Sequence, residues 1–225
     1  MIPKKIHYCW FGGNPLPKSV KKCIKSWKKY CPDYEIIEWN ESNYNVHKNL
    51  FIKEAYEKKK FAFVSDYARL DVVHSEGGIY LDTDVELIKP IDDLLAHSCF
   101  LASESIDDVN TGLGFGAEKG HWFIAENMSV YENMYFNMEN IITCVEITTK
   151  LLIERGFSAS DKIQNIDDIF IYPTEYFCPL NYKTHELHIT QNTYSIHHYD
   201  ATWQSPLMKF KTKIKYILCL AGIIK

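Results

Sequence analysis

Residues 64–84 constrain the fold of this chain more than any other stretch, because two glycines there join a helix pattern directly to a strand pattern. Apolar side chains recur at helical spacing and predict a helix with a face to bury, at Val64, Tyr67, Ala68, Leu70 and Val72. Gly77 and Gly78 supply the left-handed residue at which such a helix ends. Residues 79–81 then predict a buried strand.

Asp82 and Asp84 follow this strand, with Thr83 between them. On an extended backbone, side chains two residues apart point the same way. Two neighbouring carboxylates repel each other unless a cation lies between them, so the pair predicts a site for a divalent metal with oxygen ligands. A polar turn without a metal is the alternative interpretation.

The helix adds Asp66 and Arg69, which are three residues apart and therefore share a face. Arg69 is one of two arginines in a chain that has 23 lysines. A planar guanidinium where lysine is otherwise used indicates a geometric role, such as orienting a carboxylate, a sugar hydroxyl or a phosphate. The alternative is an ordinary surface ion pair.

Charge is unevenly distributed along the 225 residues. Residues 1–60 hold 13 lysines against 6 acidic residues, and residues 206–225 hold 5 lysines and no acidic residue, which leaves an acidic centre. This distribution suits a metal site in the centre and an anionic partner at the ends. The length is sufficient for one large domain, and the hydrophobic fraction of 46% is typical of a globular protein.

The seven cysteines are not spaced as zinc-binding pairs, and their odd number favours reduced, structural cysteine in a reducing compartment. The first residues contain no long apolar run that would indicate a secretory signal. We therefore expect the protein in the cytoplasm.

Strand and helix patterns alternate along the chain and predict an α/β domain with a largely parallel sheet. Residues 6–11 predict a first strand that opens into a glycine loop, where Trp10 could stack on a nucleotide base or belong to the core. Further strands are expected at 35–39, 99–103 and 167–172, and further helices at 50–59, 121–134 and 141–155.

The first helix, between Pro17 and Pro32, carries six lysines opposite an apolar stripe. A solvated face is the favoured interpretation, and a phosphate or an acidic membrane is the alternative. No nucleic-acid-binding motif accompanies the lysines, so we expect no nucleic-acid partner.

Two segments near the end of the chain also contain candidate functional residues. Residues 193–203 include His197 and His198, and adjacent side chains on a strand point to opposite sides, so at most one would reach a given site. That imidazole could complete a carboxylate metal site, or both histidines could be structural.

Residues 206–225 are basic and then apolar, over a run shorter than the ~20 residues of a membrane-spanning helix. They predict either an interfacial segment on an anionic membrane or a docked C-terminal helix.

Three stretches together resemble glycosyltransferase family 32, the group with a DXD sugar-binding region that includes capsular-polysaccharide transferases and yeast-type α-mannosyltransferases: residues 6–13, 65–84 and 197–203. The resemblance covers about residues 2–204. It implies an α/β domain of the GT-A type over residues 1–205, Rossmann-like, with a mixed central sheet flanked by helices. It also implies a retaining glycosyltransferase that uses Mn²⁺ or Mg²⁺ to move a hexosyl unit from a UDP- or GDP-hexose. The acceptor would be a saccharide or a lipid-linked glycan, in capsular polysaccharide or lipopolysaccharide synthesis at the inner face of the membrane.

The resemblance further implies roles for single residues. Asp84 would bind the metal directly, and Asp82 would hold the ribose and contact the metal. The donor would also be held by residues before, within and after the aspartate pair, namely Trp10, Asp66, Arg69, Thr83, His198 and Trp203. His198 would lie near the metal and the pyrophosphate. Apart from the resemblance, the sequence supplies no clear nucleophile, but Glu104, Asp107 and Asn110 on the loop after the strand at 99–103 could face the anomeric carbon. The family often has Gly-Ser-Trp where this chain has Ala201-Thr202-Trp203, which weakens the expected phosphate contact of Thr202.

Two other functions are compatible with parts of the pattern. A phosphatase of the haloacid-dehalogenase type also ends an apolar strand in an Asp-x-Asp pair that binds Mg²⁺, but that pair normally follows the first strand, near the N-terminus. A non-catalytic sugar-binding module is the other alternative, although the intact acidic pair favours catalysis.

Overall fold

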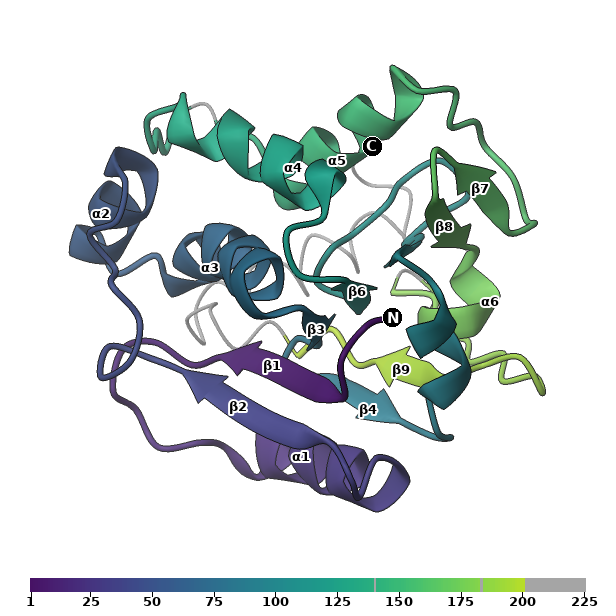
Figure 1. Cartoon of the computed structure of the whole chain (residues 1–225). Coiled ribbons are helices and arrows are strands. Elements are labelled where there is room, and N and C mark those ends of the chain that lie inside the picture. Colours follow the sequence, from purple (N-terminus) through teal and green to yellow (C-terminus); the bar gives the residue numbers. More distant parts are fainter. Residues whose placement is uncertain (140, 183, 201–225) are drawn as a thin grey trace, which may run out of the picture.

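A seven-stranded sheet with strand order β2-β1-β3-β6-β5-β8-β7 forms the centre of the computed structural model (Figure 1). The structure describes residues 1–139, 141–182 and 184–200. The predictions made for Thr202, Trp203 and residues 206–225 therefore concern segments outside the described residues. The strands of this sheet are short: β1 (Lys5–Cys9), β2 (Glu35–Trp39), β3 (Gly78–Tyr80), β5 (Cys99–Ala102), β6 (Phe115–Ala117), β7 (Gln164–Ile166) and β8 (Ile169–Tyr172).

The central sheet is mixed. Strand β1 pairs in parallel with β2 and β3, and β5 pairs in parallel with β8. Strand β6 runs antiparallel to both β3 and β5, and β7 runs antiparallel to β8. The mixed sheet expected from the resemblance is confirmed, whereas the largely parallel sheet inferred from the alternation is wrong. The reason is that β6 inserts between two parallel segments, and β7 joins β8 through a two-residue turn in which Asp167 and Asp168 both have positive φ.

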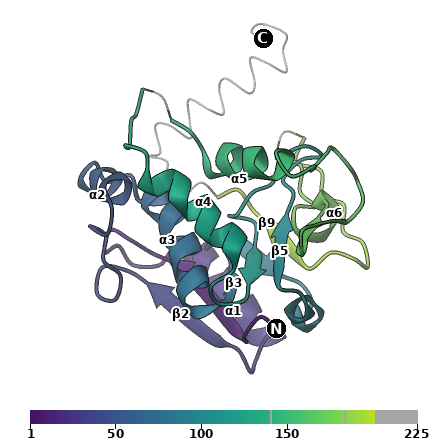
Figure 2. The ribbon, with the colours of Figure 1, turned by 45° about the horizontal axis from the view of Figure 1, so that its top comes forward.

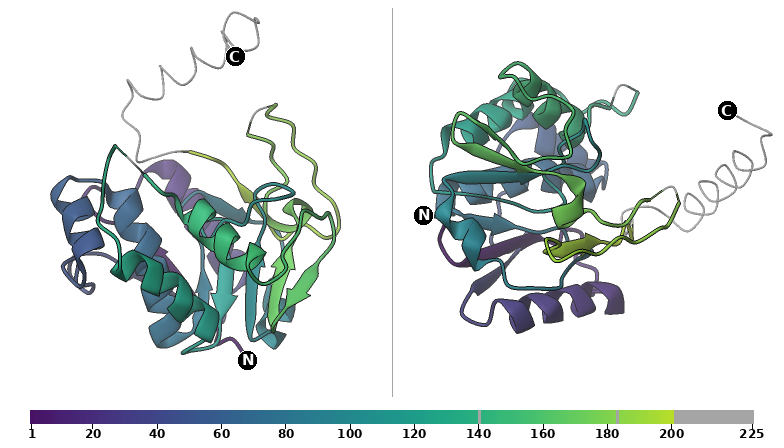
Figure 3. Two further views of the ribbon diagram at one scale, coloured as in Figure 1. Left: turned by 90° about the horizontal axis from the view of Figure 1, so that it is seen from above. Right: turned by 90° about the vertical axis from the view of Figure 1, so that its right-hand side faces the viewer.

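Helices cover both faces of the sheet (Figures 1 and 3). Helix α1 (Lys18–Tyr30) lies on one face, beside a two-stranded sheet of β4 (Val85–Leu87) and β9 (Ser195–His197). Helices α2 (Leu50–Glu57), α3 (Phe61–Glu76), α4 (Trp122–Glu132) and α5 (Cys144–Ile153) lie on the other face. Each face has its own apolar cluster, one around Trp27 of α1 and one around Tyr67 of α3. The molecule is thus a three-layer α/β domain.

The segment from α3 to β3 has the predicted form. Gly77 has φ +67°, and a Cβ there would meet the backbone nitrogen of Lys119 at 2.9 Å, so only glycine allows the chain to turn at this point. Several elements were not predicted from the sequence, namely strands β4, β6 and β7, a 3₁₀ helix (Asp92–Ala96) and the short helix α6 (Thr174–Phe177). Within the described ranges, no helix is both long and apolar enough to cross a bilayer.

Helix α3 runs beside α4 in the turned view (Figure 2), and it also contacts β3. Helix α3 packs against α2, α4 and β1, which explains why it is buried on most of its surface. Among its nine buried residues are three charged ones, Asp66, Arg69 and Asp71. Buried charges require partners, so α3 presents charged side chains around which a site can form.

Candidate active site

Arg69 links the two predicted acidic positions. Its guanidinium Nη2 lies 3.0 Å from a carboxylate oxygen of Asp66 and 3.3 Å from one of Asp82. Its Nε donates to the carbonyl oxygen of Ser65, one turn earlier in α3, at 3.1 Å. Arg69 is 4% exposed, so a single buried fork holds a helix carboxylate and a strand-end carboxylate in a fixed relation.

Three further residues form the walls around this fork. The Tyr80 hydroxyl donates to Asp82 at 3.0 Å, and the guanidinium carbon of Arg69 lies 5.0 Å from the Tyr80 ring centroid. The Cys144 thiol, on the first residue of α5, lies 3.9 Å from Nη1 of Arg69. A Cβ added to Gly112 would approach Asp82 Oδ2 to 2.4 Å, so the backbone of Gly112 lies directly against the carboxylate.

Asp84 lies beside His197 rather than His198. The Nε2 atom of His197 is 3.2 Å from Asp84 Oδ1, and one potential ligand atom each from Asp82, Asp84 and His197 fall within 4.8 Å of one another. The backbone N–H of Asp200 donates to the second Asp84 oxygen at 3.0 Å. Two carboxylate oxygens and an imidazole nitrogen converging in this way could hold a divalent metal ion.

The charges of these groups are strongly coupled. Burial raises the pKa of Asp66 to about 6, although Arg69 opposes the shift. Burial also raises the pKa of Asp82, against the effect of Arg69 and with the help of Asp84. Burial acts upward on Asp84 too, but its hydrogen bond with His197 brings that pKa below the usual value.

His197 completes this set. Burial disfavours its imidazolium, yet Asp84 holds the pKa of His197 at about 10. A proton on His197 therefore partly balances the charge of the two aspartates. A cation bound by these residues would have to displace that proton, because only the neutral imidazole is a ligand.

His198 has a different environment from the one expected. Its Nε2 lies 2.8 Å from Glu86 Oε2, and Glu86 also accepts a bond from Lys22 at 2.8 Å. The backbone N–H of His198 donates to the carbonyl oxygen of Asp84. The imidazole of His198 therefore lies with Glu86, and the structure brings His197 to the aspartate pair instead.

The loop after β5 reaches the site through Asn110. Its side-chain oxygen accepts from the Gly112 N–H at 2.6 Å and lies 3.8 Å from the Cys144 sulfur, and its amide donates to Glu104 at 2.9 Å. Asp107 instead accepts from Ser105 at 2.7 Å within the exposed part of the loop. Of the three residues expected to face the anomeric carbon, the structure thus brings Asn110, with Glu104 behind it, to the site.

Trp10 and Thr83 lie at the same edge of the sheet. Strands β1 and β3 are parallel neighbours, and Trp10 and Thr83 come shortly after their C-terminal ends. The indole N–H of Trp10 donates to the Asn14 carbonyl at 2.6 Å, and Thr83 is half-buried between the two aspartates. This edge, beyond the carboxyl ends of parallel strands, is where open α/β sheets bind ligands.

Tyr80, Gly112 and Cys144 were not singled out from the sequence. Tyr80 is two residues before Asp82 and therefore points to the same side of the strand, a signal that was available. Gly112 stands in a glycine-rich stretch, residues 110–117, and glycines in such a stretch permit close backbone approach. Nothing local marks Cys144, which is 75 residues from Arg69 and reaches it only through the packing of α5.

The chain is similar in sequence to known glycosyltransferases. The glycosyltransferase sugar-binding region containing the DXD motif matches residues 17–101. An inositol phosphoceramide mannosyltransferase of Schizosaccharomyces pombe is 27% identical over 60% of this chain and 45% of its own length. An uncharacterised glycosyltransferase of Acanthamoeba polyphaga mimivirus is 26% identical over 80% of this chain and 74% of its own length. The chain thus spans less than half of the yeast relative and about three quarters of the viral one.

A solved structure supports the fold. The PaToxG glycosyltransferase superposes on 68% of this chain and 69% of its own, with a TM-score of 0.55 and 18% sequence identity. The fold is accordingly that of GT-A glycosyltransferases, with a mixed sheet flanked by helices. The matched DXD region and the named relatives show that this chain is similar to glycosyltransferases of family 32.

Proposed function

We propose that the protein is a metal-dependent hexosyltransferase that takes a hexosyl unit from a UDP- or GDP-hexose and transfers it with retention at the anomeric carbon. The observation that carries the proposal is the convergence of Asp82, Asp84 and His197 beside the Arg69–Asp66 pair. A phosphatase or a sugar-binding module gives the buried Arg69 fork no comparable role.

The roles of the residues follow from their positions. A divalent cation held by Asp82, Asp84 and His197 would neutralise the charge that develops on a nucleoside diphosphate leaving group. Arg69 and Asp66 would orient donor-sugar hydroxyls, because the guanidinium offers fixed donors and the carboxylate offers acceptors. Trp10, at the same edge of the sheet, would stack on the base.

We further propose that the acceptor attacks on the side of the leaving group, without a covalent enzyme intermediate. The Glu104 carboxylate accepts from Asn110, and Asp107 is bonded within its own exposed loop, so neither is presented as a free nucleophile. A glycosyl adduct trapped on Glu104 or Asp107, detected by mass spectrometry of the protein quenched during turnover, would contradict this step.

The acceptor we propose is a saccharide, and more specifically a lipid-linked glycan at the cytoplasmic face of a membrane, as in capsular polysaccharide or lipopolysaccharide synthesis. The name of the yeast relative, an inositol phosphoceramide mannosyltransferase, supports a lipid-borne acceptor. The sequence of residues 206–225, basic and then apolar, supports the membrane.

A panel of nucleotide sugars with Mn²⁺ or Mg²⁺ tests the main proposal. We expect release of nucleoside diphosphate from one donor, loss of release with a chelator, and a loss of about 100-fold or more in Asp84→Asn, the magnitude typical of removing one preorganised charge-stabilising group. Asp161→Asn, which removes an exposed carboxylate elsewhere, is the matched control and should keep the parent rate.

The other outcomes of this panel identify the alternatives. Phosphate release from phosphomonoesters, without turnover of any nucleotide sugar, would favour the phosphatase. A donor that raises the melting temperature by mass action but is never turned over, even with acceptors added, would favour the binding module.

A further inference from the structure

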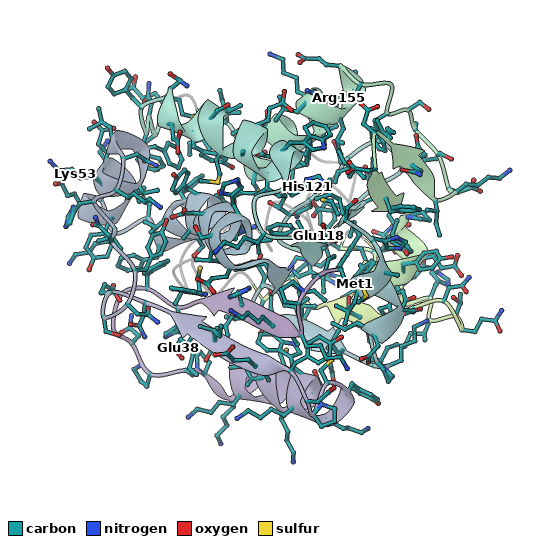
Figure 4. All side chains as sticks on the ribbon, viewed as in Figure 1. Met1, Glu38, Lys53, Glu118, His121 and Arg155 are labelled. Atoms are coloured by element: carbon teal, nitrogen blue, oxygen red, sulfur yellow. The ribbon has the colours of Figure 1, made fainter. Side chains whose placement is uncertain are left out.

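Six lysines lie along one face of α1, which we call the α1 lysine face: Lys18, Lys21, Lys22, Lys25, Lys28 and Lys29. At about 100° per residue they fall within roughly a third of the helix circumference. The opposite side is buried through Val20, Cys23 and Trp27, and the Trp27 indole donates to the Val85 carbonyl at 2.8 Å. Because the helix is fixed by that side, the lysines can only project outward, and nitrogen-tipped side chains extend from α1 away from the sheet (Figure 4).

Most of these ammonium groups have no neutralising partner in the part of the chain that the structure describes. Lys22 pairs with Glu86 at 2.8 Å, and Lys29 donates to the Tyr30 hydroxyl at 2.9 Å. Lys18, Lys21, Lys25 and Lys28 form no ion pair with a described residue, and α1 itself contains no acidic residue. The charge on this face is therefore of one sign over about 15 Å of helix.

This arrangement is unfavourable for the helix itself. Lysines three or four residues apart, such as Lys18–Lys22 and Lys21–Lys25, repel each other. Lys18 and Lys21 also lie in the first turn, where the helix dipole favours acidic residues, and no acidic residue is present there. A helix that only faced water would be more stable with both signs mixed, so the uniform charge indicates an anionic partner.

The kind of charge favours a lipid surface. The exposed positions of α1 carry lysine and serine, with no arginine fork and no exposed aromatic ring. Recognition of nucleic acid combines phosphate contacts by lysine and arginine with arginine forks on base edges and aromatic stacking, and α1 offers neither of the last two. Flexible ammonium groups alone suit a fluid array of headgroup phosphates. We propose that the α1 lysine face docks the protein on an anionic lipid bilayer.

Docking through α1 would also hold the candidate active site near the surface. Helix α1 packs on β4, which begins directly after Asp84, through the Trp27–Val85 bond and the Lys22–Glu86 pair. Glu86 in turn contacts His198. The binding itself does not depend on the transferase proposal, since it needs neither donor nor turnover, so the two can fail separately.

The test compares two triple variants of the full chain that change the net charge equally. Lys18→Glu/Lys21→Glu/Lys25→Glu reverses the α1 lysine face, and Lys53→Glu/Lys119→Glu/Lys162→Glu reverses exposed lysines elsewhere. Binding is measured by co-sedimentation at low salt with vesicles of phosphatidylcholine plus phosphatidylglycerol, and with phosphatidylcholine alone. We expect the α1 variant to bind the anionic vesicles about 100-fold more weakly, since each lysine near such a surface contributes about 1 kcal/mol.

Stability separates lost docking from misfolding. The replacements at 18 and 21 complement the helix dipole, and those at 18 and 25 each face a remaining lysine four residues later, Lys22 and Lys29, while 21 and 25 stay like-charged as in the parent. The α1 variant should therefore melt no lower than the parent protein while it loses vesicle binding. Equal binding by the two variants, which would assign docking to residues 206–225 instead, would overturn the proposal. So would equal binding to neutral vesicles, or retention of RNA but not of anionic vesicles by the parent protein.

Discussion

Arg69 shows at the scale of one residue why an arginine stands in a chain that otherwise uses lysine. Its three nitrogens contact Asp66, Asp82, the Ser65 carbonyl and the Cys144 sulfur in different directions. A lysine ammonium is a point charge and could not hold two carboxylates in a fixed relation while also bonding back to its own helix. The geometric role inferred from the sequence is therefore matched by the contacts, although its use in donor binding is a proposal.

Cys144 leads to a prediction at the same scale. Its thiol lies between Arg69 Nη1 and Asn110 Oδ1, at 3.9 and 3.8 Å, where burial raises its pKa. Cys144→Leu should reduce kcat/KM for the donor at least tenfold, because overpacking costs about 1–3 kcal/mol and would displace the guanidinium. Cys144→Ser, which keeps the size and a polar atom, should stay within a few-fold of the parent protein.

Val145, the next and also half-buried residue, provides the control for this change. Val145→Leu enlarges the same turn of α5 without touching Arg69. We therefore expect its kcat/KM for the donor, measured by steady-state kinetics, to equal that of the parent protein. If Cys144→Leu and Val145→Leu lost kcat/KM equally, the loss would come from enlarging α5 and not from displacing the Arg69 guanidinium.

At the scale of elements, the segment from Asn110 to Gly112 holds the strand-end carboxylate in place. The Asp82 N–H donates to the Gly112 carbonyl at 3.3 Å, and the Gly112 N–H donates to Asn110 at 2.6 Å. Gly112 needs no positive φ here; what it provides is the absence of a side chain beside Asp82. This loop joins β5 to β6, the strand that makes the sheet mixed.

Gly112→Ala should therefore lower the turnover rate by about 100-fold or more, with little effect on folding. The added Cβ would be 2.4 Å from Asp82 Oδ2 and 3.0 Å from Arg69 Nη1, so both side chains would have to move. Gly120→Ala is the control, because a Cβ there meets nothing within 4 Å and the cost is backbone strain at φ +76°, about 1–2 kcal/mol. A Gly112→Ala protein with parent turnover and normal far-UV circular dichroism would show that Asp82 is not held as described.

At the scale of the whole molecule, the His7 side chain connects strands β1 and β2 with the end of α3. It lies on β1 and is fully buried; its Nε2 bonds the Gly77 carbonyl at 2.8 Å, and its Nδ1 accepts from the Trp39 indole on β2 at 3.1 Å. With one nitrogen donating and the other accepting, the neutral imidazole fits and the charged form does not. Burial accordingly lowers the pKa of His7, more than the Gly77 carbonyl raises it.

The lowered pKa of His7 predicts a dependence of stability on pH. The unfolded chain, whose histidine titrates near pH 6.5, binds this proton more readily than the folded protein. The contribution of His7 is therefore complete above about pH 6.5 and is lost as the pH falls toward the folded pKa. Urea midpoints measured against pH should fall more steeply below about pH 6.5 in the parent protein than in His7→Gln. The exposed His188, replaced in the same way, should leave the profile unchanged.

Local patterns determined most of the elements, because helix caps, glycine turns and apolar periods act over a few residues. The helix of residues 64–76, the Gly77 turn and the Asp-x-Asp strand end belong to this class, and so does the juxtaposition of Asp66 with Arg69 one turn apart. What local patterns could not give is the strand order, since the insertion of β6 between β3 and β5 depends on packing between distant segments.

The choice between His197 and His198 shows most clearly what local patterns determine and what only tertiary packing determines. The sequence placed two adjacent histidines on opposite sides of an extended segment, and nothing local says which side faces the aspartates. The antiparallel register of β4 and β9 pairs Val85 with His197, which brings the His197 imidazole to Asp84 and leaves His198 with Glu86. The sequence by itself thus determined which residue types could form the site. The tertiary structure alone decided which histidine joins it, because a shift of one residue in strand register exchanges the two faces.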